Sequence, residues 1–229
     1  MVEQKELAFF GKIAAGVTHE IRNVLAIINE SNGLMSDLLT MAKDSPFPNK
    51  DRFLRSILKI EAQVRRGVEI TGKFNRFAHS VDNPIAKVDL NEIVEQSVAL
   101  ARRFAGLKNI ELRASISGRP VLLVTSPFLL QMVLTGVVEA GITYLPAGGA
   151  IAFEIDSDRE RPTVIVNFDI PGGPDLEMRG AVKTLGIWQD VVELAAQLGA
   201  TIAWSEESGG IGLSLPTELQ ETATGQSGL

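Results

Sequence analysis

Cysteine is absent from the chain, and only two histidines occur among its 229 residues. Without cysteine the protein forms no disulfide and no thiolate metal site, and His19 and His79 are too far apart in the sequence for metal-ligand spacing. We therefore expect no bound metal. Long apolar runs are missing as well, since no stretch approaches the roughly 18–20 residues of a membrane span and the first residues lack the apolar core of a signal peptide. We expect a cytoplasmic protein without a membrane segment.

An excess of positive charge is also lacking. The 22 lysines and arginines are outnumbered by 28 aspartates and glutamates, so the formal net charge is -6. A chain without a general basic field is a poor partner for duplex nucleic acid, and we expect none. What the chain does have is 45% hydrophobic residues, which is enough to bury a core.

The first part of the chain has the pattern of two long amphipathic helices. Residues 3–43 contain no proline, and their apolar residues recur at helical spacing, as do those of a second segment at 53–71. Pro46 and Pro48 separate the two segments, which predicts an antiparallel hairpin. A lone hairpin of this length leaves part of its apolar surface uncovered. We therefore expect a homodimer in which two hairpins form a four-helix bundle.

After residue 82 the pattern changes to helices mixed with short β-branched segments. We expect helices at 89–105, 127–143 and 185–198, and strands at 109–116, 120–125, 150–156, 162–169, 200–205 and 210–215. The fold class is therefore α+β: the helical hairpin followed by an α/β sandwich with helices on one face of a mostly antiparallel sheet. The expected domains are 1–82 and 83–216, with a polar, disordered tail at 217–229.

His19 interrupts an otherwise apolar-periodic segment, GVTHEIRNVLA. If the apolar stripe centres on Phe10, Val17, Ile28 and Met35, His19 lies about 180° from it and faces solvent. A neutral imidazole is a nitrogen nucleophile near neutral pH. Glu20 is suited to accept its Nδ1 proton, and Asn23, one turn further on, to orient a water or a phosphoryl oxygen. The alternative is a solvated surface histidine without a role, which composition alone favours.

His19-Glu20-Ile21-Arg22-Asn23, together with the preceding residues 11–18, resembles the H box of two-component sensor histidine kinases, in their dimerisation and histidine-phosphotransfer domain. The segments 88–94, 130–134, 146–151 and 212–216 are similar to the catalytic ATP-binding domain of the same family in order and spacing. The resemblance implies that His19 carries a phosphoryl group, that Glu20 assists proton removal, and that Asn23 positions a water for dephosphorylating a partner. Val24 stands where the family usually has proline, so we expect a straighter helix.

The half that resembles the ATP-binding domain departs from the family at its nucleotide site. Both positions of the Asn-x-x-x-Asn-type box are lost in 135–140, where Glu139 is the remaining candidate magnesium ligand. The Asp-x-Gly-x-Gly box reads from Asp169 to Gly173 with Pro171 in place of its first glycine. About a dozen residues then replace the longer lid and phosphate-binding loop. Glu139, Asp169 and Gly173 are thus remnants of a degenerate cofactor site, and we expect no ATP binding.

The resemblance leaves three hypotheses open. In the first, the protein is a histidine phosphotransferase that passes a phosphoryl group between response-regulator receiver domains, which supply the Mg²⁺, and an upstream hybrid kinase is a further expected partner. Lys12, Arg22, Ala26 and Arg65 are then the expected partner-docking residues. In the second, it is a divergent ATP-dependent sensor histidine kinase. In the third, it is a non-catalytic module that docks a receiver or a kinase.

Overall fold

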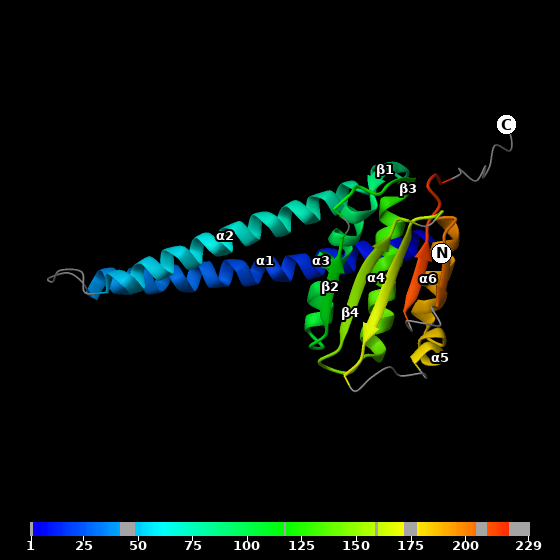
Figure 1. Ribbon diagram of the computed structural model, residues 1–229. Helices are drawn as coiled ribbons and strands as arrows, with labels where there is room; N and C mark the ends of the chain where they lie inside the picture. The colour runs from blue at the N-terminus through cyan, green and yellow to red at the C-terminus, as the bar shows by residue number, and fades with distance from the viewer. Residues whose placement is uncertain are drawn as a thin grey trace. The chain divides into compact units, whose positions relative to one another are not determined.

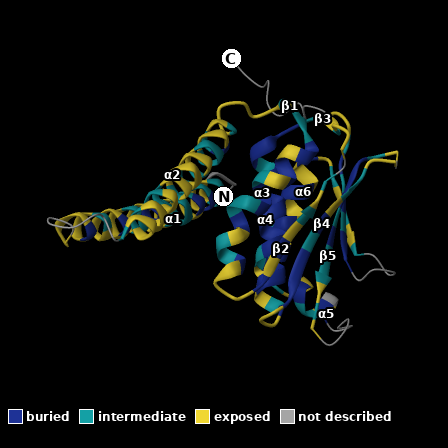
Figure 2. Ribbon diagram, turned by 60° about the vertical axis from the view of Figure 1, so that its left-hand side comes forward, coloured by how far each residue is buried: buried dark blue, intermediate teal, exposed yellow. Residues whose placement is uncertain are grey.

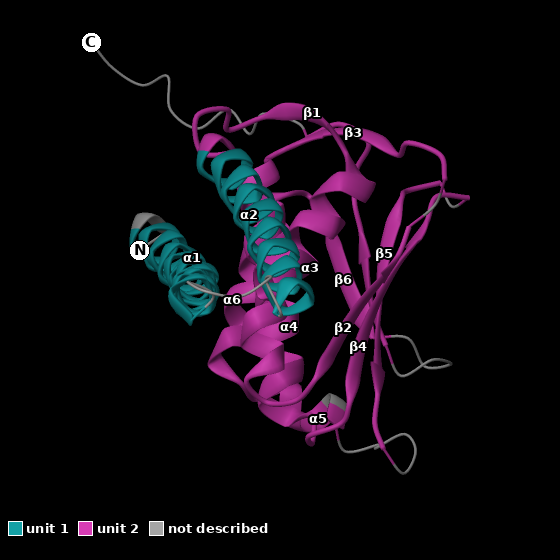
Figure 3. Cartoon of the chain, turned by 90° about the vertical axis from the view of Figure 1, so that its left-hand side faces the viewer, with its two compact units in different colours: residues 1–78 teal, residues 79–229 magenta. Residues whose placement is uncertain are grey.

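A computed structural model of the chain describes residues 2–41, 49–116, 118–158, 160–171, 178–204 and 210–219. The chain divides into two compact units, residues 1–78 and residues 79–229 (Figure 3). The expected boundary was residue 82, and the division instead falls at the end of the second long helix.

Unit 1 is the expected hairpin of two long helices, α1 (Val2–Met41) and α2 (Lys50–His79) (Figure 1). The segment with the two prolines, which separates the helices, lies at 42–48, outside the described residues. Phenylalanine rings pack between the helices: Phe77 is fully buried and stacks at 5.5 Å on Phe10, with Phe9 edge-on at 5.6 Å. Aromatic pairs in these geometries add to the hydrophobic gain of burial, so this cluster stabilises one end of the hairpin.

The buried row of α1 differs from the predicted stripe. Its members are Phe9, Ile13, Val24, Ser31 and Leu38. The four residues on which we centred the stripe are only half-buried. At about 100° per residue the true row lies roughly 60° from the predicted centre, so that prediction is wrong. The apolar band of α1 is wider than one neighbouring helix covers, and the position of α2 decides which edge of the band is buried.

Both helices also carry exposed apolar side chains. Large apolar side chains with 40% or more of their surface exposed include Leu7, Leu25 and Leu39 on α1 and Leu54, Leu58, Val64 and Val68 on α2. The direction of these side chains follows from helical periodicity. On α1, Leu25 and Leu39 lie roughly 80–130° around the helix axis from the buried row, and on α2, Val64 and Val68 lie at a similar angle with the same direction of rotation. Because the helices are antiparallel, both groups point to one side of the hairpin, here called the apolar side. His19 lies about 110° round in the opposite sense, on what we call the histidine side.

Unit 2 is an α/β sandwich. Its helices are α3 (Leu90–Gly106), α4 (Pro127–Tyr144), α5 (Met178–Lys183) and α6 (Gly186–Gln197), and its strands are β1 (Ala86–Asp89), β2 (Glu111–Ser115), β3 (Leu122–Thr125), β4 (Ala150–Asp156), β5 (Thr163–Asp169), β6 (Thr201–Trp204) and β7 (Ile211–Ser214). Helices α3, α4 and α6 cover one face of the sheet, and the buried residues concentrate between these helices and the sheet (Figure 2). The predicted α+β class and the predicted longer elements are confirmed.

The main sheet has the strand order β2-β4-β5-β7-β6. Only the β2–β4 pair is parallel, while β4–β5, β5–β7 and β6–β7 are antiparallel, which agrees with the predicted mostly antiparallel sheet. β3 lies outside it and pairs with β1. We did not predict β1 or α5; β1 has four residues and leads directly into α3, and α5 has six residues.

Part of the predicted disordered tail belongs to the fold. Thr217 accepts a hydrogen bond from the Val124 amide at 2.9 Å, and the Leu219 amide donates to the Val124 carbonyl at 2.8 Å. Residues 217–219 thus add to the free edge of β3, so backbone pairing orders a segment whose polar composition predicted disorder. Residues 220–229 lie outside the described part of the chain.

Polar side chains cap two helices of unit 2. The Asp89 carboxylate accepts from the amides of Asn91 and Val121, both at 3.0 Å, and so begins α3 while tying it to the segment before β3. Ser126 caps α4, whose first residue is Pro127, a position where the missing amide of proline costs no hydrogen bond.

Helix α4 is the core of unit 2. Within the described residues it is the one helix long and apolar enough to cross a membrane by length and composition, and 78% of it is buried inside the protein. Gly141 lets β5 approach α4 closely, since a Cβ there would lie 2.6 Å from Phe168 Cε1 and 2.9 Å from Ile151 Cδ1.

Gly141→Ala is expected to destabilise unit 2 by about 1–3 kcal/mol, because the methyl group overfills a packed core. Gly106→Ala is the matched control, since a Cβ at the end of α3 meets nothing within 4 Å. Urea denaturation of both variants measures the difference. Equal stability of the two variants would show that Phe168 moves aside without cost.

Candidate functional site

His19 lies on the exposed surface of α1. In the part of the chain that the structure describes it forms no hydrogen bond or ion pair, so both ring nitrogens are accessible. Asn23 and Ala26 are exposed on the same side of the helix, one and two turns further on, and Lys12 lies two turns before. The expected solvent exposure of His19 is therefore present, on the histidine side of the hairpin.

Glu20 faces a different direction from His19. Its side chain is only 24% exposed, and its Oε2 atom lies 3.8 Å from Nη2 of Arg66 on α2. Two of the four residues that we expected to dock a partner point away from the histidine side. Arg22 lies opposite the buried row of α1, and Arg65 lies opposite that of α2 and is ion-paired at 3.9 Å with Glu61 of its own helix.

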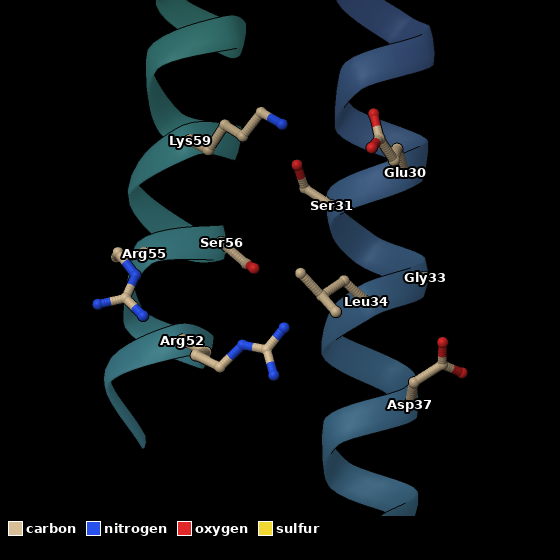
Figure 4. A pocket seen from close by; sticks show the side chains of 9 residues that line it. All are labelled: Glu30, Ser31, Gly33, Leu34, Asp37, Arg52, Arg55, Ser56 and Lys59. Carbon is tan, nitrogen blue, oxygen red and sulfur yellow. The ribbon is translucent and has the colours of Figure 1, made fainter. Parts of the chain in front are cut away.

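A groove between α1 and α2 lies on the histidine side, towards the connection of the two helices. Its volume is about 540 Å³, and Figure 4 shows the lining residues Glu30, Ser31, Gly33, Leu34, Asp37, Arg52, Arg55, Ser56 and Lys59. In Figure 4 the hydroxyls of Ser31 and Ser56 both point into the gap between the helices. Ser31 is 3% exposed, and its hydroxyl has no hydrogen-bond partner among the described residues.

Opposite charges line the two walls of this groove. Arg52, Arg55 and Lys59 come from α2, and Glu30 and Asp37 from α1. None of the five forms an ion pair with another described residue. Our sequence reasoning missed these residues, although the three cations recur at helical spacing, a signal that would have placed them on one face.

The groove and His19 belong to one surface. Glu30 and Asp37 follow His19 by 11 and 18 residues on the same side of α1. At about 1.5 Å per residue, the groove begins roughly 16 Å and ends roughly 27 Å from the histidine along the helix. A compact domain of ordinary size that contacts His19 is wide enough to cover both.

The remnants of a cofactor site lie in unit 2. Glu139 is half-buried on α4, Asp169 is exposed at the end of β5, and Gly173 lies outside the described residues. Among the described residues no group of three or more His, Asp or Glu side chains is arranged to hold a metal ion.

A basic group lies close to Asp169. On β2, Arg113 donates a 2.6 Å hydrogen bond to Glu111, which lowers the pKa of that exposed carboxyl group. The same hydrogen bond raises the pKa of Arg113, and the charge of Asp169 raises it slightly further. Asp169 therefore lies within electrostatic range of a guanidinium on the neighbouring part of the sheet.

Aromatic side chains pack beside α4 and the end of β5. Trp204 lies 6.1 Å from Phe168 and 5.7 Å from Trp188, measured between ring centroids. Trp188 is 6% exposed, and Phe168 contacts α4 at Gly141. Trp188 is therefore a core residue of unit 2, and Trp204 is half-buried.

Comparisons with known proteins give structural likenesses only. No family model matches the chain, and no curated protein matches it. Among solved structures, the chain is similar to the catalytic domain of histidine kinase ThkA (16% identity, TM-score 0.46, 58% of this chain and 96% of that one). It is also similar to the Acinetobacter baumannii histidine kinase AdeS, with 12% identity and a TM-score of 0.46 over 87% of this chain and 98% of that one. A further similar structure is the mycobacterial sensor histidine kinase MprB, with 18% identity and a TM-score of 0.43 over 59% of this chain and 99% of that one.

Fold and site together define a class of protein. It is an α+β protein in which a helical hairpin carries an exposed histidine and an α/β sandwich follows.

Proposed function

We propose that this protein is a dimeric histidine phosphotransferase of two-component signalling. His19 accepts the phosphoryl group from the aspartyl phosphate of one receiver domain and passes it to another. The observation that carries the proposal is the placement of His19: it is exposed, lies in a sequence that resembles an H box, and shares its side of the hairpin with Asn23 and a charged groove.

The transfer step needs little from this chain beyond an accessible imidazole. Nε2 of His19 attacks phosphorus, the N–P bond forms, and the O–P bond to the receiver aspartate breaks, which regenerates the carboxylate. The receiver brings the Mg²⁺ that neutralises the phosphoryl oxygens. In a separate hydrolytic reaction, Asn23 orients a water that attacks the aspartyl phosphate of the receiver and releases inorganic phosphate, which regenerates the carboxylate. Because receiver domains are the proposed partners, we propose that the protein acts in the cytoplasm.

Labelling experiments test the proposal. Receiver domains phosphorylated with ³²P are mixed with the protein, and we expect acid-labile, base-stable label on His19. If no phosphorylated receiver transfers label, the phosphotransferase proposal is wrong.

A divergent ATP-dependent autokinase is the second candidate function. The observation in its favour is that two carboxylates, Glu139 and Asp169, are retained on α4 and β5. An autokinase would become labelled on incubation with γ-labelled ATP alone, and calorimetry would detect heat when ADP binds to it. We expect neither, because Pro171 removes a backbone donor and the segment before Leu185 is short for a phosphate-binding loop.

The groove supports a receiver as the partner. A receiver seated on His19 covers the groove, and the three cations of α2 suit a mostly acidic domain, whose charge complementarity raises the association rate.

Arg55→Glu is therefore expected to weaken receiver docking roughly tenfold, because it places a carboxylate opposite an acidic surface. Arg76→Glu is the matched control: it makes the same charge change on α2 outside the groove. The KM for phosphorylated receiver, measured at two salt concentrations, reports docking. A KM equally raised by both variants would mean that only net charge matters and that the groove is not the docking site.

A further inference from the structure

Arg66 joins α2 to α1 next to the proposed phosphoryl acceptor. Its Nη2 atom lies 3.8 Å from Oε2 of Glu20, the residue that follows His19. Helical periodicity places Arg66 on the histidine side of α2, so its side chain crosses the line between the helices to reach Glu20.

A close helix contact brings Arg66 within reach. Gly67 follows it, and a Cβ there would lie 3.3 Å from Cγ1 of the buried Val24. The Thr71 hydroxyl donates at 2.6 Å to the Gly67 carbonyl in the same turn. With no side chain on α2 at this point, the two helices approach each other at Val24, about one turn beyond Glu20.

The ion pair contributes little to stability. The Arg66 side chain is 56% exposed and that of Glu20 is 24% exposed. Solvent-exposed pairs of this kind add little to the free energy of unfolding, since water screens the attraction and two long side chains lose freedom. The ion pair does restrict the position of the Glu20 carboxylate, because an unpaired glutamate samples several rotamers.

We infer that Arg66 is a positioning residue for phosphoryl transfer to His19 and acts through Glu20; the inference rests on the proposed function. As Nε2 forms its bond to phosphorus, the imidazole ring gains positive charge, and its Nδ1 proton becomes acidic. The Glu20 carboxylate accepts that proton. Arg66 holds Oε2 on the α2 side, which leaves Oε1 for the imidazole.

A small phosphoryl donor tests this without a partner protein. Phosphoramidate transfers its phosphoryl group to imidazole: the N–P bond to Nε2 forms, the donor's P–N bond breaks, and ammonia leaves. The experiment uses the full chain with His79→Ala, so that His19 is the one remaining histidine. The initial rate of acid-labile phosphorylation is measured for Arg66→Ala, Arg66→Lys, Glu20→Gln and the double variant Arg66→Ala/Glu20→Gln.

The expected rate for Arg66→Ala is about tenfold lower, since a misplaced group loses much of its contribution. Arg66→Lys is expected to recover most of the rate, because an ammonium still holds Oε2. The double variant is expected to match Glu20→Gln alone, as for residues that act through one another. Lys73→Ala is the matched control: it removes a positive charge from the same helix, and Lys73 pairs with Glu69 within α2. Its rate is expected to be unchanged.

Three results would overturn the inference: no labelling of the His79→Ala chain, an unchanged rate for Arg66→Ala, or losses in the double variant that multiply. Labelling by phosphoramidate that depends on Arg66, with no transfer from any phosphorylated receiver, would support the positioning role and disprove the phosphorelay. Thermal denaturation accompanies each rate, and a rate loss that follows a fall in Tm would also count against positioning.

Discussion

His19→Ala is expected to abolish phosphoryl transfer from a phosphorylated receiver, with a loss of roughly a thousandfold or more, because the nucleophile itself is removed. Stability is expected to stay within about 0.5 kcal/mol, since His19 is exposed and makes no hydrogen bond to a described residue. Phosphorylation gels and urea denaturation measure the two effects separately. This combination of complete functional loss and an unchanged fold is typical of a reacting group.

His79→Ala is the matched control for this experiment. His79 is the other histidine of the chain, and its Nδ1 atom lies 2.8 Å from Oδ2 of Asp82 in the turn after α2. We expect transfer to continue at the wild-type rate. If His19→Ala retained the cellular effect of the protein and its binding to the receiver, the non-catalytic docking hypothesis would replace the phosphotransferase.

Val64→Glu combined with Val68→Glu is expected to convert the proposed homodimer into a monomer of 24.7 kDa. Both valines lie on the apolar side of the hairpin and are 49% and 68% exposed in the single chain. Covering a large apolar side chain contributes about 1.5–3 kcal/mol, and a buried unpaired carboxylate costs several kcal/mol. Sedimentation equilibrium or light scattering measures the mass.

Leu107→Glu serves as the control for the dimer experiment. Leu107 is 73% exposed in unit 2, so this substitution adds the same charge to an exposed apolar residue outside the hairpin. We expect it to remain dimeric. A wild-type chain that sediments at 24.7 kDa would contradict the proposed dimer directly. The apolar side would then need a different partner.

Local periodicity predicted most of the elements. The helices at α1, α3, α4 and α6 and the strand β4 follow from spacings of 3.6 and 2 residues, which are properties of a short stretch of chain. The exposure of His19 follows from the same reasoning, because a polar residue within an apolar-periodic helix faces away from the apolar band. Two elements were missed: β1 has four residues and leads directly into α3, and α5 has six residues.

Pairing between distant residues was not predictable from periodicity. The parallel β2–β4 pair, the β1–β3 pair and the addition of residues 217–219 to β3 each depend on a register between segments far apart in the sequence. The pair between Glu61 and Arg65 has i,i+4 spacing within α2 and could be predicted locally. No local signal indicates that Arg66 reaches Glu20, because that contact depends on the rotation of α2 against α1.

By itself, therefore, the sequence determined the α+β class, the helical hairpin and an exposed histidine in a segment that resembles an H box. The tertiary structure decided which edge of the apolar band of α1 is buried, and with it the apolar side, the charged groove on the histidine side and the ion pair beside His19. The physical reason is that helical periodicity determines the faces of each helix, whereas the packing of two helices determines which faces meet.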